Sequence, residues 1–171
     1  RRIFIFQEGG VFPWLTVHQN VGFGLRGTPA AAREELIGHY LEMVGLTGCE
    51  RLYPRELSGG MRQRVEIARA LASGPEVIYM DEPFGALDYF TRFKMRDDLV
   101  RIWRHERKTI LFVTHDIDEA VQLADRVVVL GGRPATIRAI VPIELDRPRH
   151  LNSPDYLQVR DRILQTMGMR L

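Results

Sequence analysis

The chain has 171 residues, of which 45% are hydrophobic and 27% are charged. These fractions exclude a disordered, collagen-like or low-complexity protein. A net charge of +2 argues against a protein that coats nucleic acid or anionic lipid. The single cysteine, Cys49, excludes an internal disulfide framework and a multi-cysteine metal site. No apolar run is long enough to cross a bilayer or act as a signal peptide, so we expect a soluble, cytosolic-type protein.

The first third of the chain predicts one strand and one helix. Residues 3–6 form a short apolar run that predicts a buried strand, and we expect that a chain opening in such a strand once had more sequence before it. An irregular, glycine-containing stretch, residues 9–27, follows. Thr28 and Pro29 then predict a helix that ends near Gly45, with apolar residues at positions 37, 40, 41 and 44 on one face.

The middle of the chain alternates helices and strands. A second helix is predicted from Ser58 to the Gly-Pro pair at 74–75, and a fully apolar strand over 77–80 follows it. A charged amphipathic helix is predicted over 92–108, and its mixed charges favour a solvated helical face over a nucleic-acid patch. The strand 110–114 comes next and ends at His115.

The last part of the chain contains two helices and two strands. Asp116 and Glu119 form a capping-box-like start for a short helix. The segments 127–130 and 135–143 predict two further strands, and Ser153-Pro154 opens a terminal helix that extends to about residue 165.

The alternation of apolar strands and amphipathic helices predicts a parallel sheet covered on both faces. Ligands of such a sheet bind outside the carboxyl ends of its strands. Asp81, Glu82 and His115 stand at such ends. A carboxylate delivered there can hold Mg²⁺, and the next one can orient a water that attacks a phosphate. The pair by itself fits a solvated strand cap equally well.

A more specific signal is the string from Leu57 to Arg64, Leu-Ser-Gly-Gly-Met-Arg-Gln-Arg. Ser-Gly-Gly at a helix start leaves backbone N–H groups free, and the two glycines let a phosphate approach closely. An ordinary serine N-cap would not explain the whole string.

This string resembles the signature motif of ATP-binding cassette (ABC) ATPases. Further motifs of that family follow its order in this chain and extend the resemblance from residue 3 to about 145. They are a Q-loop at Phe6-Gln7, Walker B at 77–81 with Glu82 as catalytic glutamate, a D-loop at 85–88, and a switch loop at 114–116.

The resemblance implies a role for each matching residue. Asp81 and Gln7 would order Mg²⁺ and its waters, Glu82 would polarise the attacking water, and His115 would contact the γ-phosphate of ATP. Asp88 would bridge two ATPase subunits. A further set would contact nucleotide held mainly by the second of these subunits: Ser58, Gly59, Gly60 and Gln63.

The resemblance also implies the architecture. We expect an α/β fold with a P-loop NTPase-type parallel sheet between helices and a helical subdomain, with the N-terminal portion missing. Residues from about 10 to 75 would form the helical subdomain that carries the signature motif. Residues 1–9 and 76–145 would supply the remainder of the catalytic core, and 146–171 a C-terminal helix.

Two local patterns narrow the resemblance to ATPase subunits of nitrate, sulfonate and taurine importers. One is Phe12-Pro13-Trp14-Leu15-Thr16-Val17 with Asn20-Val21, and the other is Arg147-Pro148-Arg149 with Ser153-Pro154. The implied partners are integral membrane permease subunits, a second ATPase subunit in a homodimer and, indirectly, a solute-binding protein. The region around residues 12–14 would face the permease subunits. The implied location is the cytoplasm, on the inner face of the cell membrane.

One family element is missing from the sequence. The Gly-rich loop G-x-x-x-x-G-K-[ST] does not occur; the glycines at 22–27 lack the Lys-Ser/Thr pair and follow the glutamine instead of preceding it. The aromatic residue that stacks on adenine is absent too. We expect that the chain starts downstream of both, which would leave sheet edges and apolar surface uncovered and favour self-association.

Two other functions fit parts of the pattern. A truncated, non-catalytic interaction module could bind a permease or a partner ATPase through the signature face alone. DNA-repair ATPases share these motifs, but they usually interrupt the domain with a long coiled coil, and none lies between Gln7 and Ser58.

Without the Gly-rich loop, the backbone cradle, the lysine charge and the magnesium-binding hydroxyl are missing. We therefore predict that the chain as given binds Mg-ATP weakly or not at all and is inactive alone. Isothermal titration calorimetry would contradict this prediction if it showed micromolar affinity.

Overall fold

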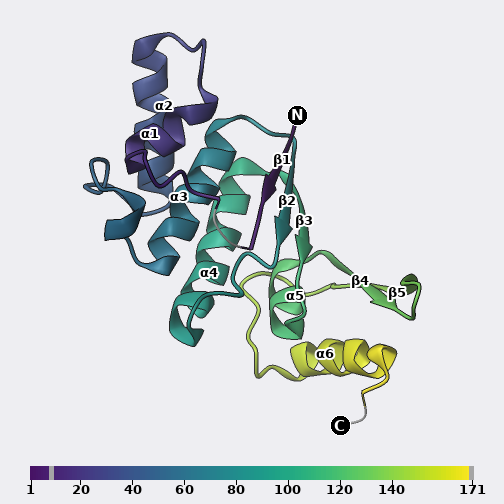
Figure 1. Ribbon diagram of the computed structural model, residues 1–171. Helices are drawn as coiled ribbons and strands as arrows, with labels where there is room; N and C mark the ends of the chain where they lie inside the picture. The colour runs from purple at the N-terminus through teal and green to yellow at the C-terminus, as the bar shows by residue number, and fades with distance from the viewer. Residues whose placement is uncertain (8–9, 170–171) are drawn as a thin grey trace. The chain divides into compact units, whose positions relative to one another are not determined.

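The computed structural model describes residues 1–7 and 10–169 and shows two compact units, residues 1–113 and 114–171 (Figure 1). The first unit contains β1 (Arg2–Ile5), α1 (Val17–Val21), the 3₁₀ turn η1 (Gly22–Gly24), α2 (Ala30–Met43), the 3₁₀ turn η2 (Pro54–Glu56), α3 (Gly59–Ala72), β2 (Val77–Asp81), α4 (Tyr89–Glu106) and β3 (Thr109–Val113). The second contains α5 (Ile117–Leu123), β4 (Arg126–Gly131), β5 (Thr136–Pro142) and α6 (Pro154–Met167).

The first unit is built on a parallel sheet in the order β1-β2-β3. Ile5 pairs with Met80 across the first strand pair, and Asp81 pairs with Val113 across the second. Strand β2 therefore has a hydrogen-bonded neighbour on each side. The three strands predicted from short apolar runs are confirmed, and so is the α/β class with a parallel sheet flanked by helices.

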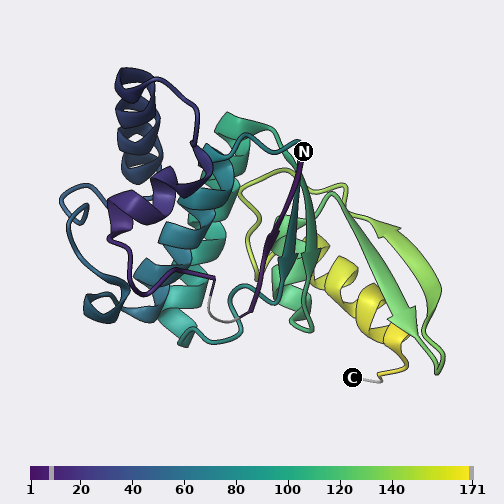
Figure 2. The same ribbon diagram turned by 45° about the horizontal axis from the view of Figure 1, so that its top comes forward.

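The two faces of this sheet differ. Ile5, Ile78 and Met80 are each 1% exposed, and Figure 2 shows α3 and α4 on one side of the strands. On the other face Phe4 is 56% exposed, although its ring stacks on Tyr79 at a centroid distance of 4.6 Å. Within the first unit, α3 and α4 thus cover the face of the sheet that carries Ile5, Ile78 and Met80. Leu111, which is in register with Tyr79 on the same face, is 53% exposed.

The stretch 9–27, predicted to be irregular, contains α1 and η1. The hydroxyl of Thr16 accepts the N–H of Gln19, and the Gln19 side-chain oxygen accepts the N–H of Thr16 at 2.9 Å. This capping box starts the short helix. Its Thr-x-x-Gln spacing is visible in the sequence, but the neighbouring glycines and prolines masked it.

Two predicted helices begin at shifted positions. Helix α2 starts at Ala30 with Pro29 as its N-cap instead of Thr28, while the predicted apolar face is buried as expected. Helix α4 starts at Tyr89 instead of Arg92, because the Asp88 carboxylate accepts the N–H of Thr91 at 3.1 Å and caps the helix there.

In the second unit, β4 and β5 form an antiparallel pair. The link between them is too short for the crossover that parallel neighbours need, so these two predicted strands form a hairpin. One side of the pair packs on α5 and α6, and the buried core of this unit consists of Val121, Val129, Val141, Ile143, Tyr156 and Ile163. The Tyr156 hydroxyl donates to the Asp118 carboxylate at 3.0 Å.

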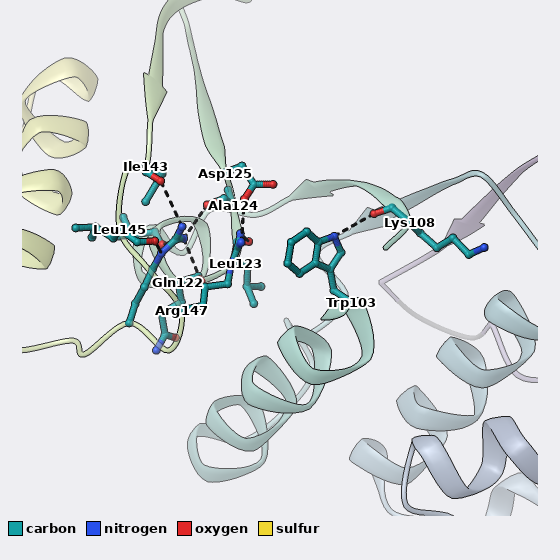
Figure 3. A network of polar contacts seen from close by, with 11 residues as sticks. Trp103, Lys108, Gln122, Leu123, Ala124, Asp125, Ile143, Leu145 and Arg147 are labelled. Carbon is teal, nitrogen blue, oxygen red and sulfur yellow. Dashed lines mark hydrogen bonds and ion pairs between the residues drawn. The ribbon is translucent and has the colours of Figure 1, made fainter. Parts of the chain in front are cut away.

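Two arginines satisfy the carbonyl groups at the C-terminal end of α5. Arg147 donates to the Leu123 carbonyl at 2.5 Å and pairs with Asp125 at 2.9 Å (Figure 3). Arg149 donates to five backbone carbonyls: those of Val121 (2.6 Å), Gln122 (3.2 Å), Ala124 (2.7 Å), Ile143 (3.4 Å) and Leu145 (2.9 Å). Burial, with a smaller contribution from Arg147, lowers the pKa of Arg149 to about 10. The Arg-Pro-Arg string therefore holds this unit together.

Within residues 1–7 and 10–169, no helix has the length and apolarity that a membrane crossing requires.

We predict that Arg149→Lys destabilises the second unit by about 2–3 kcal/mol, because one ammonium cannot replace the fork of donors and leaves buried carbonyls unpaired. Urea unfolding and hydrogen exchange in peptides covering 117–124 would measure the loss. The exposed Arg126, changed to Lys, is the matched control. Equal stability of both variants would contradict the capping role.

Candidate functional site

The carboxyl end of the sheet brings Gln7 and Glu82 together. Parallel pairing of Ile5 with Met80 makes the chain leave β1 beside the Asp-Glu pair that ends β2. A Cβ atom placed on Gly85 would lie 3.1 Å from Nε2 of Gln7 and 3.7 Å from Oε2 of Glu82. The side chains of the predicted glutamine and the predicted catalytic glutamate therefore converge on one point, which is open because residue 85 has no side chain.

Glu82 has an unusual backbone conformation. Its φ angle is +43°, in the left-handed region that non-glycine residues rarely adopt. Its N–H donates to the Val113 carbonyl at 2.9 Å, which extends the pairing of β2 with β3 by one residue. Such strained residues gather at functional sites, where the surrounding structure holds them in place. The half-buried Glu82 fits this description.

Asp81, the last residue of β2, and Gln7, just beyond β1, are both exposed at this edge. A carboxylate and an amide oxygen are hard donors of the type that Mg²⁺ prefers. No cluster of three or more His, Cys, Asp or Glu side chains suited to a metal occurs among the described residues. Because Mg²⁺ usually takes one or two protein ligands and fills its other positions with water and phosphate, the donors present fit this ion.

The predicted signature motif starts helix α3. The Ser58 hydroxyl accepts the N–H of Met61 at 3.2 Å and caps the helix. Ser58 and Gly59 are exposed, whereas Gly60 is buried. The first turn of α3 therefore presents backbone at the surface, as binding of a phosphate group would require.

The two glycines also allow close packing between the signature motif and the segment before α4. A Cβ atom on Gly60 would lie 2.6 Å from Cγ2 of Thr91, and one on Gly59 would lie 3.5 Å from Leu87. Gly60 thus has a structural role that is independent of phosphate binding.

Gln63 and Asp88 differ in exposure. Gln63 is only 8% exposed, and its Nε2 has no hydrogen-bond partner within the described part of the chain. Asp88 is exposed at the N-terminus of α4, and hydrogen bonds from the Thr91 side chain and N–H hold the pKa of its carboxyl below the usual value. The nucleotide contact predicted for Gln63 and the bridging role predicted for Asp88 stay predictions.

His115 belongs to the second unit and is exposed. The residues on either side of it are well anchored. The Thr114 hydroxyl donates to the Glu119 carboxylate at 2.7 Å and accepts the N–H of Asp116 at 3.0 Å, while the Asp116 carboxylate accepts the N–H of Glu119 at 3.1 Å. The predicted cap of α5 is confirmed, and the predicted γ-phosphate contact of His115 stays a prediction.

The sequence analysis did not identify the ion pair that supports the signature helix. Arg64 pairs with Asp98 of α4 and donates to the Val44 carbonyl, just beyond α2, at 2.5 Å. Both charged side chains are largely buried, at 15% and 13% exposure. In the sequence, Arg64 appears only as a charged residue between apolar positions of one helix. That pattern does not reveal which residue Arg64 pairs with.

The fold and the strand-end site define the class of protein: an α/β domain of the P-loop nucleoside triphosphatase type. The sequence profile of the ABC transporter family matches residues 1–85. The solved structure of cbiO1 from Clostridium perfringens, part of the ABC transporter complex cbiONQ, superimposes with a TM-score of 0.69 at 28% identity, covering 74% of this chain and 52% of that one.

Relatives with similar sequences agree. An ABC transporter ATP-binding protein of Methanocaldococcus jannaschii is 51% identical over 95% of this chain. The aliphatic sulfonates import ATP-binding protein SsuB of Bacillus subtilis is 48% identical over 94% of it. The chain spans 62% and 63% of the length of these two relatives. This chain belongs to the ABC transporter ATPase family.

We predict that Gly60→Ala destabilises the protein by about 1–3 kcal/mol, because the new methyl group collides with Thr91. Thr91→Ser removes Cγ2 and keeps the hydroxyl and the N–H that bind Asp88, so the double variant should recover most of the loss. Denaturant unfolding of the two single variants and the double variant measures this coupling. If the losses in unfolding free energy of the two single variants simply add up in the double variant, the methyl group at position 60 does not collide with Thr91, and the prediction is wrong.

Proposed function

We propose that this chain belongs to the ATP-binding and ATP-hydrolysing subunit that energises an ABC importer. The observation that supports it most directly is the convergence of Gln7 and Glu82 on the open position at Gly85. A carboxylate and an amide at one sheet edge can together orient a water molecule for attack on a phosphate.

In this proposal Glu82 accepts a proton from the attacking water, and its strained backbone keeps the carboxylate at the end of β2. Gln7 orients the same water through its amide, and Asp81, with Gln7, would hold Mg²⁺ directly or through water. The ion, when bound, neutralises charge on the phosphates. Ser58, Gly59 and Gly60 contact the γ-phosphate of nucleotide held by a second copy of the chain, with Asp88 between the copies and His115 at the γ-phosphate.

The solute class proposed is an aliphatic sulfonate, nitrate, taurine or a similar small molecule. The support is the similarity to SsuB, which is named for aliphatic sulfonate import, together with the local strings around residues 12–17 and 147–149. In this proposal a binding protein and permease subunits determine which solute is transported. The ATPase subunit does not contribute to that specificity.

For the permease we propose a docking surface of three aromatic side chains, Phe12, Trp14 and Phe23. The Phe12 ring lies 4.5 Å from that of Phe23 and 5.6 Å from that of Trp14, measured between centroids. Trp14 is 70% exposed. Exposed aromatic groups of this kind mark protein–protein contacts, and the partner would hold the subunit at the cytoplasmic face of the membrane.

We predict that Glu82→Gln in the complete ATPase domain of the assembled transporter leaves Mg-ATP binding intact and slows hydrolysis by at least about 10²-fold, the low end for a positioned general base. Glutamine keeps the size and the backbone demand of the position but cannot accept the proton. Calorimetry measures binding, and phosphate release measures turnover.

Glu35→Gln, at an exposed position of α2, is the control and should leave both quantities unchanged. Turnover of Glu82→Gln equal to that of the unaltered transporter would refute the proposed role.

A further inference from the structure

Two rings of the docking surface, those of Phe12 and Trp14, stand on a loop, residues 12–16, that one buried side chain supports. This side chain is Asn20 of α1, which has an exposed fraction of 0%. Its Oδ1 accepts the N–H of Phe12 at 2.9 Å, and its Nδ2 donates to the Phe12 carbonyl at 3.1 Å. One side chain therefore binds both backbone polar groups of Phe12, which lies eight residues before it in the chain.

The same amide binds the part of the loop that follows Trp14. Its Nδ2 lies 3.1 Å from the Leu15 carbonyl and 3.0 Å from the Thr16 carbonyl, so two N–H groups serve three acceptors, including that of Phe12. Pro13 stiffens the loop further, because its ring fixes the φ angle of the residue between the two aromatic side chains. The backbone of the loop is thus fixed from the inside, while Trp14 is 70% exposed.

The signature helix α3 supports the docking surface from a second side. The guanidinium of Arg69 lies over the Phe12 ring, 4.7 Å from its centroid. Burial lowers the pKa of Arg69, and a cation that has lost water attracts an aromatic ring more strongly than an exposed one. A Cβ atom on Gly24 would lie 3.1 Å from Cβ of Ser73, so the turn that carries Phe23 lies directly against the end of α3.

Binding that must first order a flexible loop is weakened by the lost conformational freedom, whereas a loop already fixed in its bound shape avoids this loss. We propose that Asn20 is a positioning residue that fixes the docking surface in its binding shape before the permease arrives, with Arg69 as a second support. The effect on binding rests on the proposed function, whereas the contacts within the loop do not. Because Asn20 is fully buried, it acts on a partner only through the loop.

The support of the loop is tested in the complete ATPase subunit by amide hydrogen exchange measured by NMR. Asn20→Ala removes the acceptor of the Phe12 N–H, so the ratio of exchange at Phe12 to exchange at Ile67 in α3 should rise about tenfold, as expected for loss of one hydrogen bond. The ratio separates local opening of the loop from general destabilisation, which accelerates both amides. Asn152→Ala, the same change at an exposed position, is the control and should leave the ratio unchanged. An unchanged ratio in Asn20→Ala would overturn the proposal.

The effect on binding is tested with the permease subunits of the same transporter, reconstituted in lipid nanodiscs. Trp14→Ala removes an exposed ring and should weaken binding about tenfold. Asn20→Ala should weaken binding by a similar factor of about ten, because the loop must then be ordered on binding.

The double variant of Asn20 and Trp14 distinguishes positioning from an independent effect. If Asn20 acts by presenting the docking surface, the two losses overlap, and the double variant should bind about tenfold more weakly, not about a hundredfold. A hundredfold loss, about the product of two independent effects, would contradict the positioning role. Unchanged binding by Asn20→Ala would contradict it as well.

The second support is tested by changing Arg69. Arg69→Leu removes the cation over the Phe12 ring and should weaken permease binding about fivefold, whereas Arg69→Lys retains a cation and should bind nearly as well as the unaltered subunit. Arg55→Leu is the matched control, because Arg55 lies over Tyr53, a ring outside the docking surface, at 5.6 Å. Equal binding by Arg69→Leu and the unaltered subunit would refute this support.

Failure of the proposed function gives a different result. Normal permease binding by Trp14→Ala would refute the docking surface itself, and with it the role of Asn20 in binding. The exchange ratio at Phe12 decides whether Asn20 supports the loop in either case, because that measurement does not involve the permease.

Discussion

Parallel pairing of β2 with a strand on each side is the constraint on which the site depends. Because β1 and β3 fix the register of β2, Asp81 and Glu82 emerge at the same edge as Gln7. The bond from the Glu82 N–H to Val113 continues that pairing past the strand end and holds Glu82 at a positive φ. A register slip of one residue would turn every side chain to the opposite face and separate these groups.

Helix α3 connects the sheet edge to the rest of the first unit. Three contacts along it, in order, are Gly60 against Thr91, Arg64 with Asp98, and the Glu66 carboxyl against the backbone of Gly10. The first two join the signature helix to α4, and the third joins it to the chain at Gly10.

Much of this arrangement could be predicted because it is local in the sequence. Apolar runs gave the three parallel strands, and polar caps such as Ser58 and Asp116 gave helix starts that the structure confirms. Errors arose where local signals competed. The capping box at Thr16 is surrounded by glycine and proline residues, and the Asp88 cap precedes an exposed aromatic pair that does not look like the start of an amphipathic helix.

The order of motifs, the class of fold and the chemical identity of the groups at the strand ends could be inferred from residue type and short spacing along the chain. Which of these groups meet depends on how the chain folds in space. The convergence on Gly85, the partner of Arg64 and the contact of Glu66 with Gly10 join residues far apart in the chain. Such contacts depend on strand register and helix packing, which residue spacing along the chain does not encode.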